Sequence, residues 1–244
     1  MISDDRQGRL SFTCVVIPTF KEKENISRLC RALRQLSPEM KILVVDDNSP
    51  DGTGALADQL ALELTPLEVI HRTGKGGRGS ACLEGFRRAL RMPEVRYVVE
   101  MDADFSHDPK ELPETLEALV TADVVIRSRY LKDSIILDWT RSRRVFSRLA
   151  NNFARQVLKI PLSDFTNGYR AYTRRAVEAL EFERIDSKGY VVLSEVACQL
   201  YRKGFRFREL PSRFVNRRRG ESNLSFHEIV SAFSGVVRLA LKGY

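Results

Sequence analysis

Two apolar, β-branched runs in this chain end in clusters of carboxylates. The run 97–101 leads into Asp102-Ala103-Asp104, and the run 41–45 leads into Asp46-Asp47. Short apolar runs of this composition predict buried strands. Ligands of α/β sheets bind at the carboxyl ends of the strands, so the two acidic strand ends predict one cleft rimmed with carboxylates.

The Asp102-x-Asp104 pair offers two hard oxygen ligands at the lip of the predicted sheet. Such ligands suit Mg2+ or Mn2+, which keep water and substrate phosphates as their remaining ligands. Alone the motif is weak, because many strands end in aspartate to start the next turn. The second acidic strand end favours a binding site over an incidental turn.

Strands and helices alternate through the first half of the chain. We predict strands at 11–17, 41–45, 67–70, 97–101 and 122–126, and helices at 25–36, 53–64, 80–90 and 113–120. This alternation predicts an α/β fold with a mostly parallel, doubly wound sheet and helices on both faces. The segment Pro18-Thr19-Phe20 then lies at the same edge of the sheet as the two acidic strand ends.

The second half of the chain is less regular. We predict a loop at 133–139, a helix at 141–158, a short strand at 170–173, a helix at 192–202, a long strand at 205–215 and an amphipathic helix at about 225–242. In the 141–158 helix, the apolar residues share one face and the arginines lie on the other; the apolar set is Phe146, Leu149, Ala150, Phe153 and Val157. Because no linker or internal repeat is present, we expect a flexible N-terminus over residues 1–10 and one domain over 11–244.

Charge and hydropathy restrict the partners and the location. The chain of 244 residues has 40 basic and 32 acidic residues, and its net charge of +8 favours an anionic partner: nucleic acid, a membrane surface or a phosphorylated substrate. The aromatic residues are not interleaved with the basic ones, which argues against nucleic acid. The polar N-terminal residues lead us to expect no signal peptide, and no run of 18 apolar residues occurs in the sequence. We therefore expect a cytoplasmic protein or one peripheral to a membrane. The four cysteines are widely spaced, so we expect buried, reduced thiols.

The segment Gly74-Lys75-Gly76-Gly77-Arg78-Gly79 matches the G-x-G-x-x-G pattern of dinucleotide-binding loops. Such a loop normally follows the first strand of its βαβ unit, and a dehydrogenase has no need of Asp102-x-Asp104. It is not a P-loop, because Ser80-Ala81 stands where Lys and Ser or Thr should follow. Two interpretations remain: a flexible basic loop that leads into a helix, or a loop in which Lys75 or Arg78 faces a phosphate.

Basic residues form two clusters, and the histidines form none. The clusters are Arg127, Arg129, Lys132, Arg141, Arg143, Arg144 and Arg148, and then Arg213, Arg217, Arg218 and Arg219. Arg129 and Arg217 each follow an apparent strand, in loops that could cover the cleft, and guanidinium groups suit phosphate oxygens. His71, His107 and His227 have no metal-ligand spacing and are interpreted as non-catalytic; no nucleophile signature occurs.

With these motifs in order, the chain resembles the family 2 glycosyltransferases of the GT-A fold, and among them the dolichyl- and polyprenyl-phosphate mannose synthases without transmembrane helices. The resemblance extends from about residue 12 to 235. It is carried by the segments 16–25, 45–53, 101–109, Ser128-Arg129-Tyr130, Arg143 with Ser147, 166–170, 187–190 and Arg217-x-x-Gly220-Glu221-Ser222.

The resemblance implies a role for each matching residue. It implies that the nucleoside is held by Pro18, Phe20, Glu22, Val45 and Asp47. It implies that the metal and the sugar diphosphate are bound at Asp102, Ala103 and Asp104. It also implies that Arg217 closes over the diphosphate. The residues that it implies for binding the lipid phosphate are Arg129, Arg143 and Ser147. Four departures from the family pattern leave the sugar and the base open: Phe20 for tyrosine, Arg78 for an apolar residue, Val192-Leu193 for Phe-Gln and Asn223 for lysine.

The implied activity is a metal-dependent, inverting transfer of a hexose, mannose from GDP-mannose, to a polyprenyl or dolichyl phosphate. The acceptor oxygen is already anionic, so no strong general base is needed. The implied location is the cytoplasmic face of a membrane. The protein would be attached there through the basic face of 141–155, the C-terminal helix or a small membrane-protein partner. Three alternatives stay open: UDP-glucose as donor, a hydroxyl acceptor with Asp164 or Glu195 as base, and a non-catalytic basic module.

Overall fold

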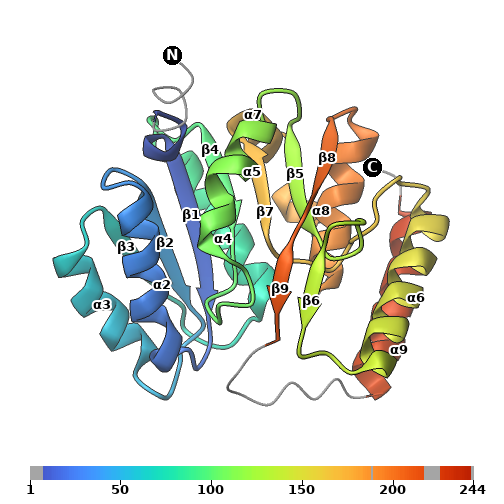
Figure 1. The fold of residues 1–244 in the computed structure, drawn as a ribbon, viewed down its shortest axis with the longest axis horizontal. Helices are drawn as coiled ribbons and strands as arrows, with labels where there is room; N and C mark the ends of the chain where they lie inside the picture. The colour runs from blue at the N-terminus through green and yellow to red at the C-terminus, as the bar shows by residue number, and fades with distance from the viewer. Residues whose placement is uncertain (1–7, 188, 217–225, 243–244) are drawn as a thin grey trace.

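A seven-stranded sheet forms the centre of the computed structural model, which describes residues 8–187, 189–216 and 226–242 (Figure 1). The strand order is β3-β2-β1-β4-β7-β5-β8. These strands are β1 (Thr13–Thr19), β2 (Lys41–Asp46), β3 (Leu67–His71), β4 (Tyr97–Glu100), β5 (Val124–Ser128), β7 (Arg170–Thr173) and β8 (Phe207–Pro211). The five strands predicted in the first half and the 170–173 strand therefore exist, with ends displaced by up to two residues.

Parallel pairing dominates the sheet, as predicted. Only β7 runs antiparallel, to its neighbours β4 and β5, among the strand pairs of the described residues. The insertion of β7 between β4 and β5 divides the sheet. The strands β1 to β4 form one half, which carries both acidic strand ends, and β5 and β8 form the other.

Helices cover both faces of the sheet because successive strand residues point to opposite sides. Val15 and Ile17 of β1 pack into one core with helices α2 (Lys23–Leu36), α3 (Thr53–Glu63) and α5 (Leu112–Ala118). Val16 faces the other core. That core receives α4 (Arg78–Leu90), α6 (Arg141–Leu158), α7 (Arg174–Glu178), α8 (Val191–Arg202) and α9 (Phe226–Leu241).

A small second sheet was not predicted. The expected loop 133–139 contains the strand β6 (Ile135–Leu137), which pairs in parallel with β9 (Arg213–Val215). The long strand predicted at 205–215 is therefore wrong: it is divided at Ser212 into β8 and β9, which belong to different sheets. Ser212 bridges the two parts, since its N–H donates to Ser128 O (3.0 Å) and its carbonyl accepts from Ile135 N (3.0 Å).

Two further features concern the N-terminus and α6. Residues 8–11, which overlap the N-terminus expected to be flexible, form a helical turn in which Leu10 is buried; residues 1–7 lie outside the described chain. In α6, the inward residues are Asn151, Ala154 and Leu158, whereas Phe146 is 40 % exposed and Leu149 60 % exposed. The apolar stripe predicted for α6 is thus only partly covered.

All four cysteines are buried free thiols, as predicted, and burial raises the pKa of Cys14 and of Cys30 to about 12. Their thiols therefore stay protonated at neutral pH. Within the described residues, no helix combines the length and apolar character that a membrane span requires.

Candidate active site

The two acidic strand ends meet at one edge of the sheet. β1 pairs in parallel with β2 on one side and with β4 on the other. The carboxyl ends of the three strands are therefore adjacent, with Asp47 directly after β2 and Asp102 two residues after β4. This arrangement confirms the predicted convergence at one edge.

The glycine-rich loop wraps around Asp47. The amides of Gly76 and Gly77 donate to its two carboxylate oxygens at 3.0 and 2.6 Å, and Arg72 forms an ion pair with it. Gly77 has φ of +87°, a conformation that favours glycine. The first role of the loop is therefore to bind a carboxylate of its own chain.

The other residues expected to hold the nucleoside lie around Asp47. Pro18 and Val45 are buried in β1 and β2. Glu22 precedes α2, and its carboxylate accepts from Asn25 Nδ2 at 2.9 Å. The ring of Phe20 is half-buried, with Lys75 Nζ 4.1 Å from its centroid. The ammonium group of Lys75 thus lies over the Phe20 ring, and that of Lys21 lies 5.7 Å from the same centroid.

Arg78 bonds to the other acidic strand end. Its Nε donates to Asp102 Oδ1 (2.6 Å), its Nη1 to Glu100 Oε2 (2.9 Å) and its Nη2 to the carbonyl of Gly168 (2.9 Å). Lys75 and Arg78 were both candidates to face a phosphate, and in this structure Arg78 faces two carboxylates.

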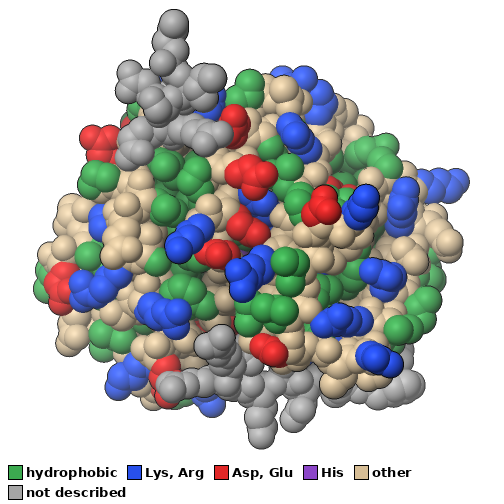
Figure 2. Space-filling model, in the orientation of Figure 1, with side chains coloured by type: hydrophobic (Ala, Val, Ile, Leu, Met, Phe, Trp, Pro, Cys, Tyr) green, Lys and Arg blue, Asp and Glu red, His purple; other side chains and the backbone are tan. Residues whose placement is uncertain are grey.

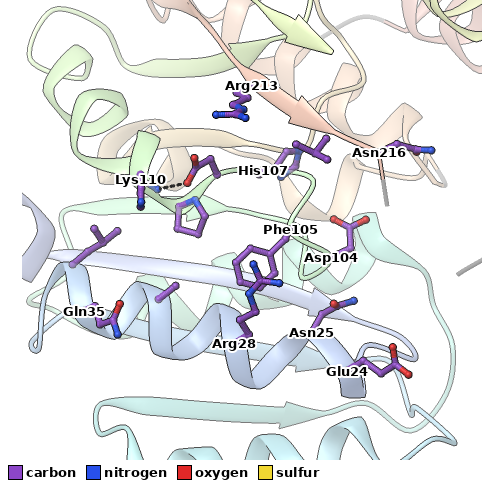
Figure 3. A pocket seen from close by; sticks show the side chains of 15 residues that line it. Glu24, Asn25, Arg28, Gln35, Asp104, Phe105, His107, Lys110, Arg213 and Asn216 are labelled. Carbon is purple, nitrogen blue, oxygen red and sulfur yellow. Dashed lines mark hydrogen bonds between the residues drawn. The ribbon is translucent and has the colours of Figure 1, made fainter. Parts of the chain in front are cut away.

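Asp104 lies on the side of the loop that faces α2. Its Oδ1 accepts from Ser106 N (3.0 Å) and from Ser106 Oγ (2.6 Å). Beside it is a cavity of about 620 Å³ between α2, the 104–110 loop and β9 (Figure 3). Arg28 of α2 lies over the ring of Phe105, 4.4 Å from its centroid. Asp104 and Asp102 therefore face different neighbours.

A chain of hydrogen bonds connects the acidic strand end to a buried arginine. Asp102 N donates to His107 Nδ1 (3.4 Å), and His107 Nε2 is 2.8 Å from Asn167 Oδ1. Asn167 N donates to Asp164 Oδ1 (3.0 Å), and Asp164 pairs with Arg129. His107 therefore bridges the acidic strand end and the loop that carries Asn167.

Arg129 is paired inside the protein. Its Nε and Nη2 donate to the two oxygens of Asp164, each at 2.7 Å, and it is 7 % exposed. Burial would raise the pKa of Asp164, but the charge of Arg129 and the hydrogen bonds hold that pKa below its ordinary value. The guanidinium of Arg129 lies over Trp139 and Phe214, 5.4 and 5.3 Å from their centroids.

Arg143 and Ser147 lie one turn apart on α6, next to the same aromatic group. Arg143 donates to Asn216 Oδ1 (3.0 Å) and lies 4.3 Å from the centroid of Trp139. Ser147 Oγ accepts from Tyr130 OH at 2.5 Å. Both guanidinium groups that the resemblance implies for the acceptor phosphate therefore lie against Trp139.

Comparison with known proteins identifies the family. The family model described as glycosyl transferase family 2 matches residues 14–181. The chain belongs to glycosyl transferase family 2. It is 41 % identical over 233 residues to polyprenol monophosphomannose synthase of Mycolicibacterium smegmatis, covering 95 % of this chain and 88 % of the relative. It is also 41 % identical over 226 residues to undecaprenyl-phosphate mannosyltransferase of Micrococcus luteus, covering 93 % of each.

Solved structures share the fold. Glucosyl-3-phosphoglycerate synthase from Mycobacterium tuberculosis, solved with Mn2+ and UDP, has a TM-score of 0.66 and 19 % identity, covering 98 % of this chain and 82 % of that one. This likeness confirms the GT-A fold that was expected from the sequence.

Not every basic or acidic residue singled out in the sequence is available to a ligand. Arg127 of β5, part of the first basic cluster, is 1 % exposed and pairs with Glu114 at 2.7 Å. Arg217 lies outside the described residues. Both carboxylates considered as a general base are buried in ion pairs, Asp164 with Arg129 and Glu195 with Lys242.

Sequence reasoning assigned no role to Arg72, Trp139 or Asn167. Arg72 directly follows β3, the third strand end at this edge, and that position was a usable signal. Asn167 was noted only as part of a family motif, although its hydrogen bonds link His107 to Asp164. Trp139 lay in a segment predicted to be a loop, where nothing local indicated that two arginines would contact it.

Proposed function

We propose that this glycosyl transferase moves mannose from GDP-mannose to a polyprenyl phosphate, with inversion at the anomeric carbon. The observation that carries the proposal is the hydrogen-bonded path from Asp102 through His107 and Asn167 to the Asp164–Arg129 pair. It connects the proposed donor site at Asp102 to the Asp164–Arg129 pair beside Trp139, next to Arg143, where the anionic acceptor would bind. Two relatives at 41 % identity carry the names of polyprenyl-phosphate mannosyltransferases.

In the proposed reaction, an oxygen of the lipid phosphate attacks the anomeric carbon from the face opposite the nucleotide. A new C–O bond forms as the bond to the diphosphate breaks, and the electron pair leaves with the diphosphate. The attacking oxygen is already ionised, so no proton has to be removed. This agrees with the burial of Asp164 and Glu195 in ion pairs, which makes neither available as a base for a hydroxyl acceptor.

The chemistry of Asp102 and Asp104 fits Mg2+ or Mn2+. Both are hard oxygen donors, and within the part of the chain that the structure describes no group of three acidic, His or Cys residues forms a complete metal cage. Mg2+ binds with few carboxylates when substrate phosphates complete its coordination. Bound there, the cation would offset charge that develops on the leaving diphosphate. The nucleoside would lie toward Asp47, Phe20 and Glu22.

Arg143 is the better candidate for direct contact with the acceptor phosphate. Arg129 is already neutralised by Asp164, whereas no carboxylate pairs with Arg143 among the described residues. Two anions must share the site, and an uncompensated guanidinium offsets their repulsion. Arg129 would orient the loop and Trp139, and Ser147 with Tyr130 would line the acceptor side.

We further propose peripheral attachment at the cytoplasmic face of a membrane. Basic and hydrophobic side chains lie together over the right side of the molecule in Figure 2, where α6 runs in Figure 1. On α6, Val145 is 59 % exposed and Leu149 60 % exposed, next to the exposed Arg141 and Arg148. An exposed apolar and basic helix face fits an anionic lipid surface. A small membrane-protein partner on the same face is the alternative mode of attachment.

The test is transfer from a panel of labelled nucleotide sugars, with polyprenyl phosphate, a glycan or no acceptor. The proposal predicts organic-extractable label from GDP-mannose only when polyprenyl phosphate is present. Label transferred from UDP-glucose instead would show that the donor is not GDP-mannose. Label in a water-soluble glycan would show that the acceptor is not a lipid phosphate. Absence of turnover with every donor would favour a non-catalytic module.

A further inference from the structure

Arg78 carries a positive charge into the acidic end of the site. Its three nitrogens reach Asp102, Glu100 and the carbonyl of Gly168 at 2.6 to 2.9 Å. The side chain is 16 % exposed. It begins α4, directly after Gly77, whose amide binds Asp47. One short segment therefore holds the carboxylates of both acidic strand ends.

Arg78 forms ion pairs with two carboxylates, those of Asp102 and Glu100. Glu100 is 1 % exposed and also accepts a hydrogen bond from Tyr172 OH at 2.6 Å. Arg78 is its only ion-pair partner in the described chain. An arginine side chain stays protonated in proteins, so the guanidinium of Arg78 compensates two carboxylates at once.

We propose that Arg78 is a resident counter-ion that competes with the divalent cation for Asp102 and so sets the metal affinity of the donor site. The inference rests on the proposed function, in which Asp102 and Asp104 hold the metal. A guanidinium 2.6 Å from Asp102 Oδ1 repels a second cation at that carboxylate.

Competition at Asp102 also affects the order of binding. Without nucleotide, Asp102 is occupied by Arg78, and the metal alone should bind weakly. A nucleoside diphosphate brings anionic oxygens that attract both cations, so the metal and the donor should bind together. Arg78 is in this view a positioning residue, which acts through Asp102 and the metal.

The experiment measures free Mn2+ by electron paramagnetic resonance during titration of the purified protein without nucleotide or acceptor. Arg78→Gln removes the charge but keeps an amide that can donate to a carboxylate, and Arg78→Lys keeps the charge. Arg88→Gln is the matched control, because Arg88 pairs with Glu68 near the other end of the same helix. We expect the Mn2+ dissociation constant of Arg78→Gln to fall about tenfold. This is the effect expected from removing the repulsion of one nearby positive charge. Arg78→Lys and Arg88→Gln should stay close to wild type.

Adding Asp102→Asn to Arg78→Gln should remove the gain. An Arg78→Gln protein that binds Mn2+ no tighter than wild type would overturn the proposal, as would an equal gain in Arg78→Lys.

If Arg78→Gln fails to fold, as judged by circular dichroism, the wild-type protein still provides a test. GDP must then raise its Mn2+ affinity at least about tenfold, and equal affinity with and without GDP would contradict the proposal. None of these readouts depends on sugar transfer, so a wrong donor or acceptor would leave them unchanged.

Discussion

Arg129 and Arg143 differ in electrostatic compensation, although both lie beside Trp139. Arg143→Ala should weaken use of polyprenyl phosphate by about 2–5 kcal/mol if the phosphate site is desolvated, because the anion loses a guanidinium that no carboxylate of the described residues neutralises. Thermal stability should change little. Arg129→Ala should lower both acceptor use and the melting temperature, because it leaves the buried Asp164 without its cation.

Initial rates at varied acceptor and donor concentrations, together with thermal unfolding, check this difference. Affinity for the nucleotide sugar, measured by calorimetry, should be nearly unchanged in both variants. A collapse of donor affinity in both would show that the two arginines do not serve the acceptor.

Asp104→Asn should nearly abolish transfer and leave the fold intact. The amide oxygen can still accept from Ser106 N and Oγ, so the local turn is retained while the charge is lost. The measurement is initial rate at saturating Mn2+, with Asp133→Asn in an exposed loop as the control. Full activity of Asp104→Asn, or of the wild type in excess chelator, would be incompatible with a metal at this carboxylate.

The acidic residues of the site could be predicted because the carboxyl ends of parallel strands all lie at the same edge of the sheet. A polar residue that directly follows such a strand therefore lies at that edge. Asp47 and Asp102 lie there as expected. Their partners could not be predicted: Asp102 meets Arg78 from the start of α4, and Arg129 meets Asp164 across 35 residues of sequence. Such pairings depend on loop paths, which have no periodicity in the sequence.

At the scale of elements, α4 connects the glycine-rich loop to the core through close packing. A Cβ on Gly85 would overlap a methyl group of Val16 in β1, so α4 lies nearly in contact with the strand. Gly85→Ala should destabilise the protein by roughly 1–3 kcal/mol, a typical cost of overpacking. Gly8→Ala is the control, because a Cβ added at Gly8 would meet no atom within 4 Å. Urea unfolding of both variants checks the prediction, and equal midpoints would contradict it.

Long periodic elements could be predicted and short ones could not. The bounds of α6 and β7 match the prediction residue by residue. The strands β6 and β9 have three residues each and are defined by pairing with each other, which no local pattern indicates. An amphipathic helix usually covers a core with its apolar face. The apolar face predicted for α6 is instead partly exposed, at Phe146 and Leu149.

At the scale of the whole molecule, α6 lies beside α9 at one end of the sheet (Figure 1), and it leaves Val145 and Leu149 exposed. We predict that the protein binds vesicles containing anionic phosphatidylglycerol and that high salt releases most of it, because molar salt screens charges within about 3 Å. Leu149→Ser should weaken binding, whereas Leu62→Ser, an equally drastic change at an 87 % exposed site on α3, should not. Retention through both high salt and alkaline carbonate would contradict peripheral attachment.

The proposed acceptor is an anionic phosphate on a lipid, delivered to a site whose candidate bases are occupied by ion pairs. The most direct measurement offers purified protein, GDP-mannose and Mn2+ either a polyprenyl phosphate or the polyprenol of the same chain length. The two acceptors differ only in the phosphate. We predict mannosylated lipid from the phosphate and none from the alcohol, with release of one GDP per mannose transferred. Mannosylation of the polyprenol at a comparable rate would contradict the proposed mechanism.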